Sequence, residues 1–162
     1  MKTVLLLRHA KSSWKDEGLS DHERPLNKRG KEDAPRAGQW LRKQELVPQL
    51  ILSSTAVRAR TTAEIAAEEC GYEGEIELRP DLYSFEPEPF LKALAEAPDD
   101  CDPVMLVGHN PAMEELVQAL AGELQPMPTA AVACIQLPIE RWSEVKKGRR
   151  GKLVELWRPK EA

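Results

Sequence analysis

The feature that most constrains the fold is the alternation of short apolar runs with longer segments of helical periodicity. Lys2–Leu7 contains a continuous apolar run of the kind found in strands that are buried on both faces of a sheet. Gln49–Ser53 and Pro103–Val107 have the same character. Glu75–Arg79 alternates polar and apolar residues, which predicts another strand. Two further strands are expected near the end of the chain, at Ala130–Leu137 and Lys152–Trp157.

Helices are predicted between most of these strands. Asn27 is a good N-cap for a helix with apolar residues at helical spacing. Ser54 or Thr55 is expected to cap a second helix that runs to about Cys70, with Gly71 as its C-cap. A third helix is expected over Glu88–Ala97. A fourth is expected to end near Gly122, with Asn110 as its N-cap and Pro111 at its first helical position. Ala10–Leu26 has no clear period, and a loop of that length in a small protein is usually functional or disordered.

This order of elements predicts an α/β fold with three layers, in which helices cover both faces of a mostly parallel central sheet. No linker or internal repeat is visible, so we expect residues 1–162 to form a single domain. In such sheets, ligands bind outside the carboxyl ends of the strands. Those ends are therefore the places to search for chemistry.

Composition excludes several classes of function. The net charge of −4 gives no general field for nucleic acid, and no apolar run approaches the roughly 20 residues that a membrane span needs. Val4–Leu7 is too short for the core of an export signal, so a cytoplasmic location is expected. A monomer is the favoured oligomeric state. The three cysteines are widely spaced and predict reduced thiols rather than a disulfide framework; they are Cys70, Cys101 and Cys134.

Polar side chains follow three of the predicted strands where each strand ends. Arg8 and His9 follow the first strand, Arg58 lies about one helical turn beyond the second, and His109 follows the fourth. Arginine offers a planar fork that matches phosphate oxygens, and helix N-termini also favour anions. The groups together predict a pocket for a tetrahedral anion that contains imidazole. A metal site is a rival use of the two histidines, but the neighbouring arginines would repel a cation.

Three motifs resemble those of the histidine phosphatase superfamily. Leu5–Ala10 is similar to its Arg-His-Gly signature, Ser54–Ala63 to its second arginine motif, and Val107–Pro111 to its second-histidine motif. The chain length suits the compact, SixA-like branch, and Asp21–Leu26 resembles the loop that follows the first motif there. The resemblance implies a phosphoglycerate mutase-like fold.

The resemblance also implies roles for individual residues. His9 would be the nucleophile that takes the phosphoryl group before water hydrolyses the phosphohistidine, and Arg8, Arg58 and His109 would hold the phosphate oxygens. No metal ion or cofactor is implied. Three residues are weaker candidates for contacts with phosphate or substrate: Ser12, Asn110 and His22. Trp14 lies close to Arg8 and His9 in the sequence and is a candidate for shaping the entrance to the site.

The sequence departs from the family pattern in two places. Ala10 replaces the usual glycine, and no glutamate falls clearly on the site after the third strand. Asp81, Glu86 and Glu88 are candidate general acids, although each fits a solvated loop carboxylate better. An alkoxide leaving group needs such an acid, whereas the imidazole of a phosphoramidate departs more easily.

The favoured function is therefore hydrolysis of protein phosphohistidine, with a phosphorylated protein as the partner. The alternatives are a phosphatase for small phosphomonoesters or nucleotide-type phosphates, and a non-catalytic module that binds phosphorylated ligands.

Overall fold

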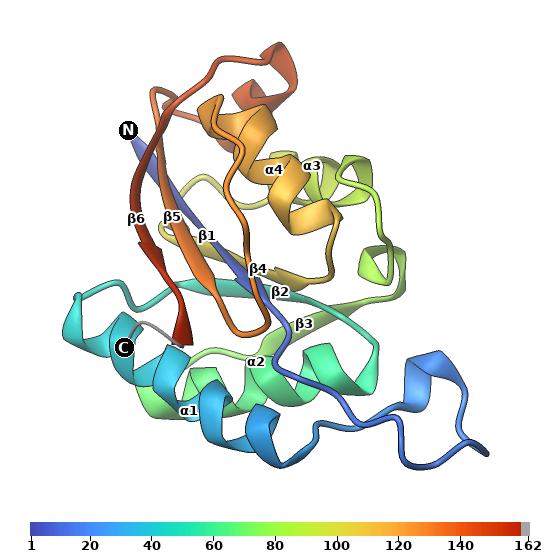
Figure 1. The fold of residues 1–162 in the computed structure, drawn as a ribbon. Coiled ribbons are helices and arrows are strands. Elements are labelled where there is room, and N and C mark those ends of the chain that lie inside the picture. The colour runs from blue at the N-terminus through green and yellow to red at the C-terminus, as the bar shows by residue number, and fades with distance from the viewer. Residues whose placement is uncertain (160–162) are drawn as a thin grey trace.

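The computed structural model describes residues 1–159, which form a six-stranded sheet with helices on both faces (Figure 1). The strand order is β3-β2-β4-β1-β5-β6. Neighbouring strands are parallel from β3 to β1, whereas β5 is antiparallel to both β1 and β6. The strands are β1 (Lys2–Arg8), β2 (Leu50–Ser54), β3 (Ile76–Arg79), β4 (Val104–Gly108), β5 (Val132–Leu137) and β6 (Lys152–Trp157).

Two helices cover each face of the sheet, so the three-layer α/β prediction is confirmed (Figure 1). One layer contains α1 (Lys28–Lys43) and α2 (Val57–Cys70). The opposite layer contains α3 (Glu88–Ala95) and α4 (Ala112–Ala121). Three short 3₁₀ helices lie in the connections: η1 (Asp21–Glu23), η2 (Pro80–Leu82) and η3 (Trp142–Lys147). Among residues 1–159 no helix has both the length and the apolar character to cross a membrane.

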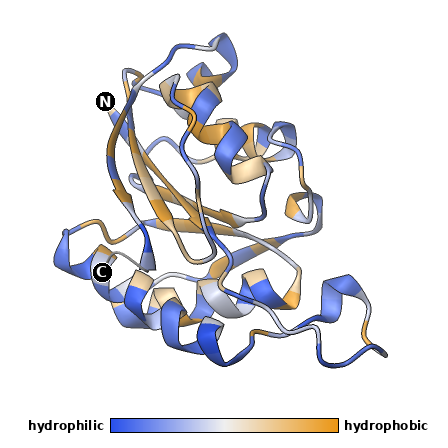
Figure 2. Ribbon diagram, viewed as in Figure 1, coloured by the Kyte–Doolittle hydropathy of each residue, from blue (hydrophilic) through white to orange (hydrophobic). Residues whose placement is uncertain are grey.

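The central strands are apolar because both of their faces are covered. Leu6 and Leu106 pack with α3 and α4, while Leu5 and Met105 pack with α1 and α2. All four side chains are fully buried. Side chains alternate across a sheet, so the period of two divides these residues between two apolar clusters. Figure 2 shows the apolar strands between helices whose outer surfaces are more hydrophilic.

Helix ends follow the predicted signals only in part. Asn27 caps α1 by accepting a hydrogen bond from the Gly30 N–H at 2.9 Å, and Gly71 ends α2 in the left-handed region with φ +84°. Ala56, rather than Ser54 or Thr55, precedes α2, and Pro111 lies just before α4 instead of in its first turn. Ser54 is instead the last residue of β2, with its hydroxyl bonded to His109, which accounts for the first difference.

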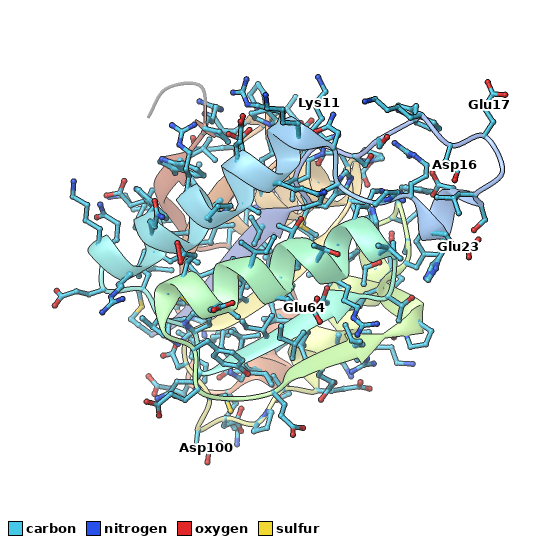
Figure 3. All side chains as sticks on the ribbon, turned by 90° about the horizontal axis from the view of Figure 1, so that it is seen from below. Lys11, Asp16, Glu17, Glu23, Glu64 and Asp100 are labelled. Carbon is cyan, nitrogen blue, oxygen red and sulfur yellow. The ribbon has the colours of Figure 1, made fainter. Side chains whose placement is uncertain are left out.

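The segment between β1 and α1 extends away from the sheet (Figure 1). Figure 3 shows Asp16, Glu17 and Glu23 at the far end of this segment. Its base returns to the protein, because Ser12 pairs with Leu26 in an isolated antiparallel bridge. The base therefore lies beside the carboxyl end of β1, while Asp16 and Glu17 project away from it.

Candidate functional site

The register of β1 and β4 brings the two predicted active-site histidines together. Arg8 is the register partner of Gly108, so the residues that follow, His9 and His109, leave the sheet side by side. The His9 N–H donates to the Gly108 carbonyl at 2.9 Å, and the two imidazole centroids are 5.2 Å apart. This pairing places both rings at the carboxyl edge of the parallel strands, where ligand sites of α/β sheets are found.

The last position of β4, Gly108, has no room for a side chain. A Cβ atom at this position would be 2.4 Å from the ring of Phe90, which is itself fully buried. No larger residue fits without moving that ring. The close contact between β4 and α3 therefore fixes the backbone that immediately precedes His109.

The hydrogen bonds of His9 determine which ring nitrogen is free to react. Nδ1 lies 2.7 Å from the carbonyl oxygen of Ala10, and a carbonyl only accepts, so Nδ1 carries the proton. In the neutral ring the lone pair is then on Nε2. The side chain is 8% exposed. Burial, followed by the nearby charges of Arg58 and Arg8, lowers the pKa of His9 to about 4, so the ring is neutral at pH 7.

His109 is held as firmly as His9. Its side chain is 1% exposed, and its Nε2 is 2.8 Å from the Ser54 hydroxyl at the end of β2. Burial and then the proximity of His9 and Arg58 lower the pKa of His109 to about 3. Its Nδ1 is buried and has no hydrogen-bond partner within residues 1–159. That nitrogen is therefore available to a ligand bound beside His9.

Two guanidinium groups flank the histidines, Arg58 from helix α2 on one side of the sheet and Arg8 from the end of β1 on the other. Arg58, from the first turn of α2, is 3% exposed and donates to the backbone oxygen of Asp21 at 2.6 Å and to its Oδ2 at 3.0 Å. Arg8 donates to the Met127 carbonyl at 3.0 Å from the other side of the sheet. The Nε of Arg8 is buried without a partner in the described part of the chain. Both cations therefore retain N–H groups for an anion.

Asp21, the first residue of η1 in the β1–α1 segment, forms a third wall of the site, which the sequence did not identify residue by residue. Asp21 accepts hydrogen bonds from Arg58, Arg24 and the Tyr83 hydroxyl. Partial burial raises the pKa of Asp21, but these hydrogen bonds outweigh it and lower the pKa to about 2. Asp21 is therefore ionised, and its hydrogen bonds connect the β1–α1 segment to Arg58 in α2 and to Tyr83 after η2.

These groups line a cleft of about 340 Å³ at the carboxyl edge of the sheet. Ser12 and Asn110, two of the weaker candidates for substrate contact, both line it. The Ser12 hydroxyl accepts from Arg24, and the Asn110 amide donates to the Met127 carbonyl at 2.9 Å. His22 does not line the cleft; its Nε2 lies 2.8 Å from the Thr55 hydroxyl. The complete lining consists of Arg8, His9, Lys11, Ser12, Trp14, Asp21, Arg24, Arg58, Phe85, His109, Asn110 and Thr129.

None of the three candidate general acids lines this cleft. Asp81 faces Arg79, with Oδ2 3.0 Å from Nη2, and that hydrogen bond lowers the pKa of Asp81. Glu86 and Glu88 are exposed. Asp21 is the one carboxylate among the lining residues, and it is ionised. The cleft therefore offers an anion four cationic side chains and no protonated carboxyl group: Arg8, Lys11, Arg24 and Arg58.

The side chains around the paired histidines can be compared with those that a metal site needs. Within residues 1–159 no cluster of three or more histidine, cysteine, aspartate or glutamate side chains has the geometry to hold a metal ion. The residues that surround the paired histidines are arginines, a lysine and neutral polar groups. The donor set is therefore suited to an oxyanion.

Comparison with known proteins agrees with this geometry. The family model of the histidine phosphatase superfamily (branch 1) matches residues 4–86. An uncharacterised chloroplastic protein of Arabidopsis thaliana is 35% identical over 152 residues, which cover 88% of this chain and 70% of the relative.

Solved structures of the same shape include SixA proteins. A candidate phosphohistidine phosphatase SixA from Agrobacterium tumefaciens is 30% identical, covers 98% of both chains and gives a TM-score of 0.83. A protein histidine phosphatase SixA in complex with tungstate is 25% identical over 98% of both chains, with a TM-score of 0.78. With its motifs, fold and family match in agreement, this chain belongs to the histidine phosphatase superfamily, in a SixA-like branch.

Proposed function

We propose that this protein is a phosphatase that hydrolyses phosphohistidine in proteins, with His9 as the nucleophile. Family membership supports phosphatase activity in general. The finer assignment depends on one observation: the cleft that contains His9 has no carboxyl group able to protonate a leaving group. A tungstate complex is known for a similar SixA structure, and tungstate is a tetrahedral oxyanion like phosphate.

The first step is attack by the neutral His9 ring. The lone pair on Nε2 forms a bond to phosphorus, while the bond from phosphorus to the substrate nitrogen breaks and its electron pair stays on that nitrogen. The hydrogen bond from Nδ1 to the Ala10 carbonyl keeps Nε2 directed toward the substrate. Arg8 and Arg58 offset charge on the equatorial oxygens, and His109 Nδ1 provides a further contact to them.

The second step is hydrolysis of phospho-His9. A water molecule attacks phosphorus, the bond to Nε2 breaks, inorganic phosphate leaves, and the proton lost by water passes to solvent. The low pKa of His9, about 4, returns the ring to its neutral state for the next cycle.

Leaving-group chemistry decides between substrates. Departure of an alkoxide, whose conjugate acid is about as weak as water (pKa about 16), requires a proton donor in the site. The imidazole of phosphohistidine has a second ring nitrogen that solvent can protonate at a pKa near 6.5, so it leaves as a neutral molecule without help from the protein. A site whose lining carboxylate is held ionised by two arginines therefore favours phosphohistidine.

The test is a comparison of kcat/KM for a phosphohistidine-containing protein, an aryl phosphate, a nucleotide phosphate and an alkyl phosphate. We expect a preference of about a thousandfold or more for phosphohistidine over the alkyl ester, the size of effect that general-acid catalysis supplies when it is present. Equal values for the two would overturn the assignment. The same panel in excess chelator tests metal independence, and activity is expected to be unchanged.

The same experiment distinguishes two alternative functions from the proposed one. A small-molecule phosphatase would turn over the nucleotide or alkyl phosphate best. A module that only binds phosphorylated ligands would release no phosphate from any compound, including the aryl phosphate. The presence of both histidines and both arginines in one cleft argues against such an inactive module. A cytoplasmic location and a monomeric state are part of this proposal.

A further inference from the structure

Two exposed aromatic side chains lie at the mouth of the cleft. Trp14 is 75% exposed and Phe85 is 49% exposed, and both belong to the lining. They are also the only aromatic residues among the large exposed hydrophobic side chains of residues 1–159, where the others are Met1, Leu78 and Leu124. Apolar surface left in water is unfavourable, and two such rings at one cleft are typical of a ligand contact.

Trp14 is held by a fixed cation. Its ring lies under the guanidinium carbon of Arg24, 3.2 Å from the ring centroid. Arg24 is buried and donates to the Ser13 carbonyl and to Asp21 Oδ1, each at 3.0 Å. The cation therefore occupies one face of the indole, and the ring remains largely open to solvent although its position is set.

Phe85 is held by the second histidine. Its ring centroid lies 5.6 Å from that of His109 and 6.2 Å from that of Tyr83, in edge-to-face arrangements. The Tyr83 hydroxyl is bonded to Asp21, so this aromatic group is connected to the same anion that fixes Arg24 and Arg58. One side of Phe85 therefore packs on the active site, and about half of its surface faces solvent.

The chemistry places the leaving group beside these rings. In-line transfer puts the departing group on the side of phosphorus opposite to His9. His9, Arg58 and His109 are each at most 8% exposed and form the floor, so the departing group is directed toward the mouth. The lining residues that are exposed there are Lys11, Trp14, Asp21 and Phe85. A planar ring that leaves in this direction meets two aromatic surfaces, with which rings pair favourably.

We propose that Trp14 and Phe85 form a leaving-group subsite that selects a planar heteroaromatic ring, the imidazole of phosphohistidine. This inference rests on the proposed function and extends it, because the missing acid explains only why an activated P–N bond is cleaved. The subsite explains why one P–N compound is preferred to another. In this proposal, the aromatic side chains recognise the imidazole ring, whereas the absence of a general acid restricts the site to an activated P–N bond.

Two small substrates isolate that difference. Phosphoimidazole and phosphoramidate both carry phosphorus on nitrogen, but only phosphoimidazole has a ring. We expect the combined Trp14→Leu and Phe85→Leu variant to lose about tenfold in kcat/KM on phosphoimidazole, the scale of one or two aromatic pairs, and less than twofold on phosphoramidate. Leucine keeps an apolar side chain at both positions, so the substitutions remove the aromatic rings while apolar surface still covers the backbone there.

A binding measurement gives a second readout. In a His9→Ala background, which cannot form the covalent intermediate, phosphoimidazole is expected to change the fluorescence of Trp14 on binding, and phosphoramidate is not. Adding Trp14→Leu should remove that change. Leu124→Ala is a matched control, because Leu124 is exposed and does not line the cleft.

The outcomes separate the two proposals. Equal loss on both substrates, or no loss on either, overturns the leaving-group subsite and leaves the phosphatase assignment standing. If the unmodified protein hydrolyses neither phosphoramidate nor phosphoimidazole, the proposed function fails, and the subsite fails with it.

Discussion

The floor and the rim of the cleft are built in different ways. The floor consists of the buried side chains of His9, Arg58 and His109. The two histidines lie at the ends of adjacent parallel strands and are positioned by strand register and burial. The rim consists of Trp14, Asp21 and Phe85, which lie on connecting segments and are exposed. Under the proposed function, the histidines that react are fixed by the sheet, and the groups that would meet the leaving group lie on connecting segments. This division allows selectivity to change without disturbing the reaction.

Removal of the nucleophile is the strongest test of the floor. His9→Ala is expected to reduce turnover by about 10⁴-fold or more and to abolish the acid-labile phosphoenzyme, since no other neutral imidazole with a directed Nε2 takes its place. Phosphate release and trapping of labelled protein measure both effects. His22→Ala is the matched control, because His22 lies outside the cleft and should leave activity within about threefold. An active His9→Ala protein would contradict the assignment.

The isomer of the trapped phosphoenzyme gives a further check. The Nδ1 proton of His9 is held by Ala10, so the phosphoryl group is expected on Nε2. NMR of the labelled protein distinguishes the two nitrogens, and a phosphoryl group on Nδ1 would rule out the orientation described for the floor.

Arg58 is the floor residue that is also hydrogen-bonded to the rim, through Asp21, so its substitution tests how the two parts are connected. Arg58→Ala is expected to lower kcat/KM by about 10²–10³-fold, the usual effect of losing one preorganised donor to a developing anion. Arg58→Lys keeps the charge but loses the planar fork that also holds Asp21, so it should restore less than about a tenth of the activity. Arg60→Ala, on the exposed side of the same helix, is the control. Full activity in Arg58→Lys would show that a positive charge at this position is enough for catalysis and that the planar guanidinium is not required.

The floor also predicts how stability depends on pH. His9 and His109 have folded-state pKa values of about 4 and about 3, below the ordinary 6.5. As pH falls below about 6.5, protons bind the unfolded chain first, so the free energy of unfolding should decrease from pH 6.5 to about 4. Each histidine contributes up to about 1.4 kcal/mol per pH unit.

Urea unfolding of the unmodified protein and of His9→Ala at pH 7.5, 6 and 5 measures this slope. The variant should show a shallower decline than the unmodified protein. Identical slopes would mean that His9 is not kept neutral by the fold.

The smallest effects are expected for carboxylates outside the cleft. Asp81→Asn, Glu86→Gln and Glu88→Gln should each change kcat/KM on a phosphohistidine substrate by less than about twofold, because Asp81 is paired with Arg79 and the other two are exposed. A tenfold loss in any of them, with normal thermal unfolding, would identify a general acid that moves into the site when substrate binds.

The layered sheet and the floor of the cleft were predictable because they follow from local patterns. Apolar runs of strand length predict buried parallel strands, and the residues after them meet at one edge of the sheet. This reasoning placed His9 and His109 together, and the structure confirms that their rings are neighbours.

The rim was not predictable in the same way. Asp21 is positioned by hydrogen bonds from Arg58 and Tyr83, which lie 37 and 62 residues away in the sequence, and the segment that carries Asp21 has no period. Ser54 was expected to cap a helix, but its hydroxyl contacts His109, a partner 55 residues away. Local capping rules contain no information about such a partner.

The strand register described for β1 and β4 has a consequence for insertions and deletions. Deleting one residue within β1 would turn His9 to the opposite face of the sheet, away from Arg58, because side chains alternate along a strand. The same deletion near Asp16 would shorten a projecting segment and leave both histidines in place. Length variants at Asp16 are therefore expected to keep the register of β1 and β4 and the pairing of the two histidines.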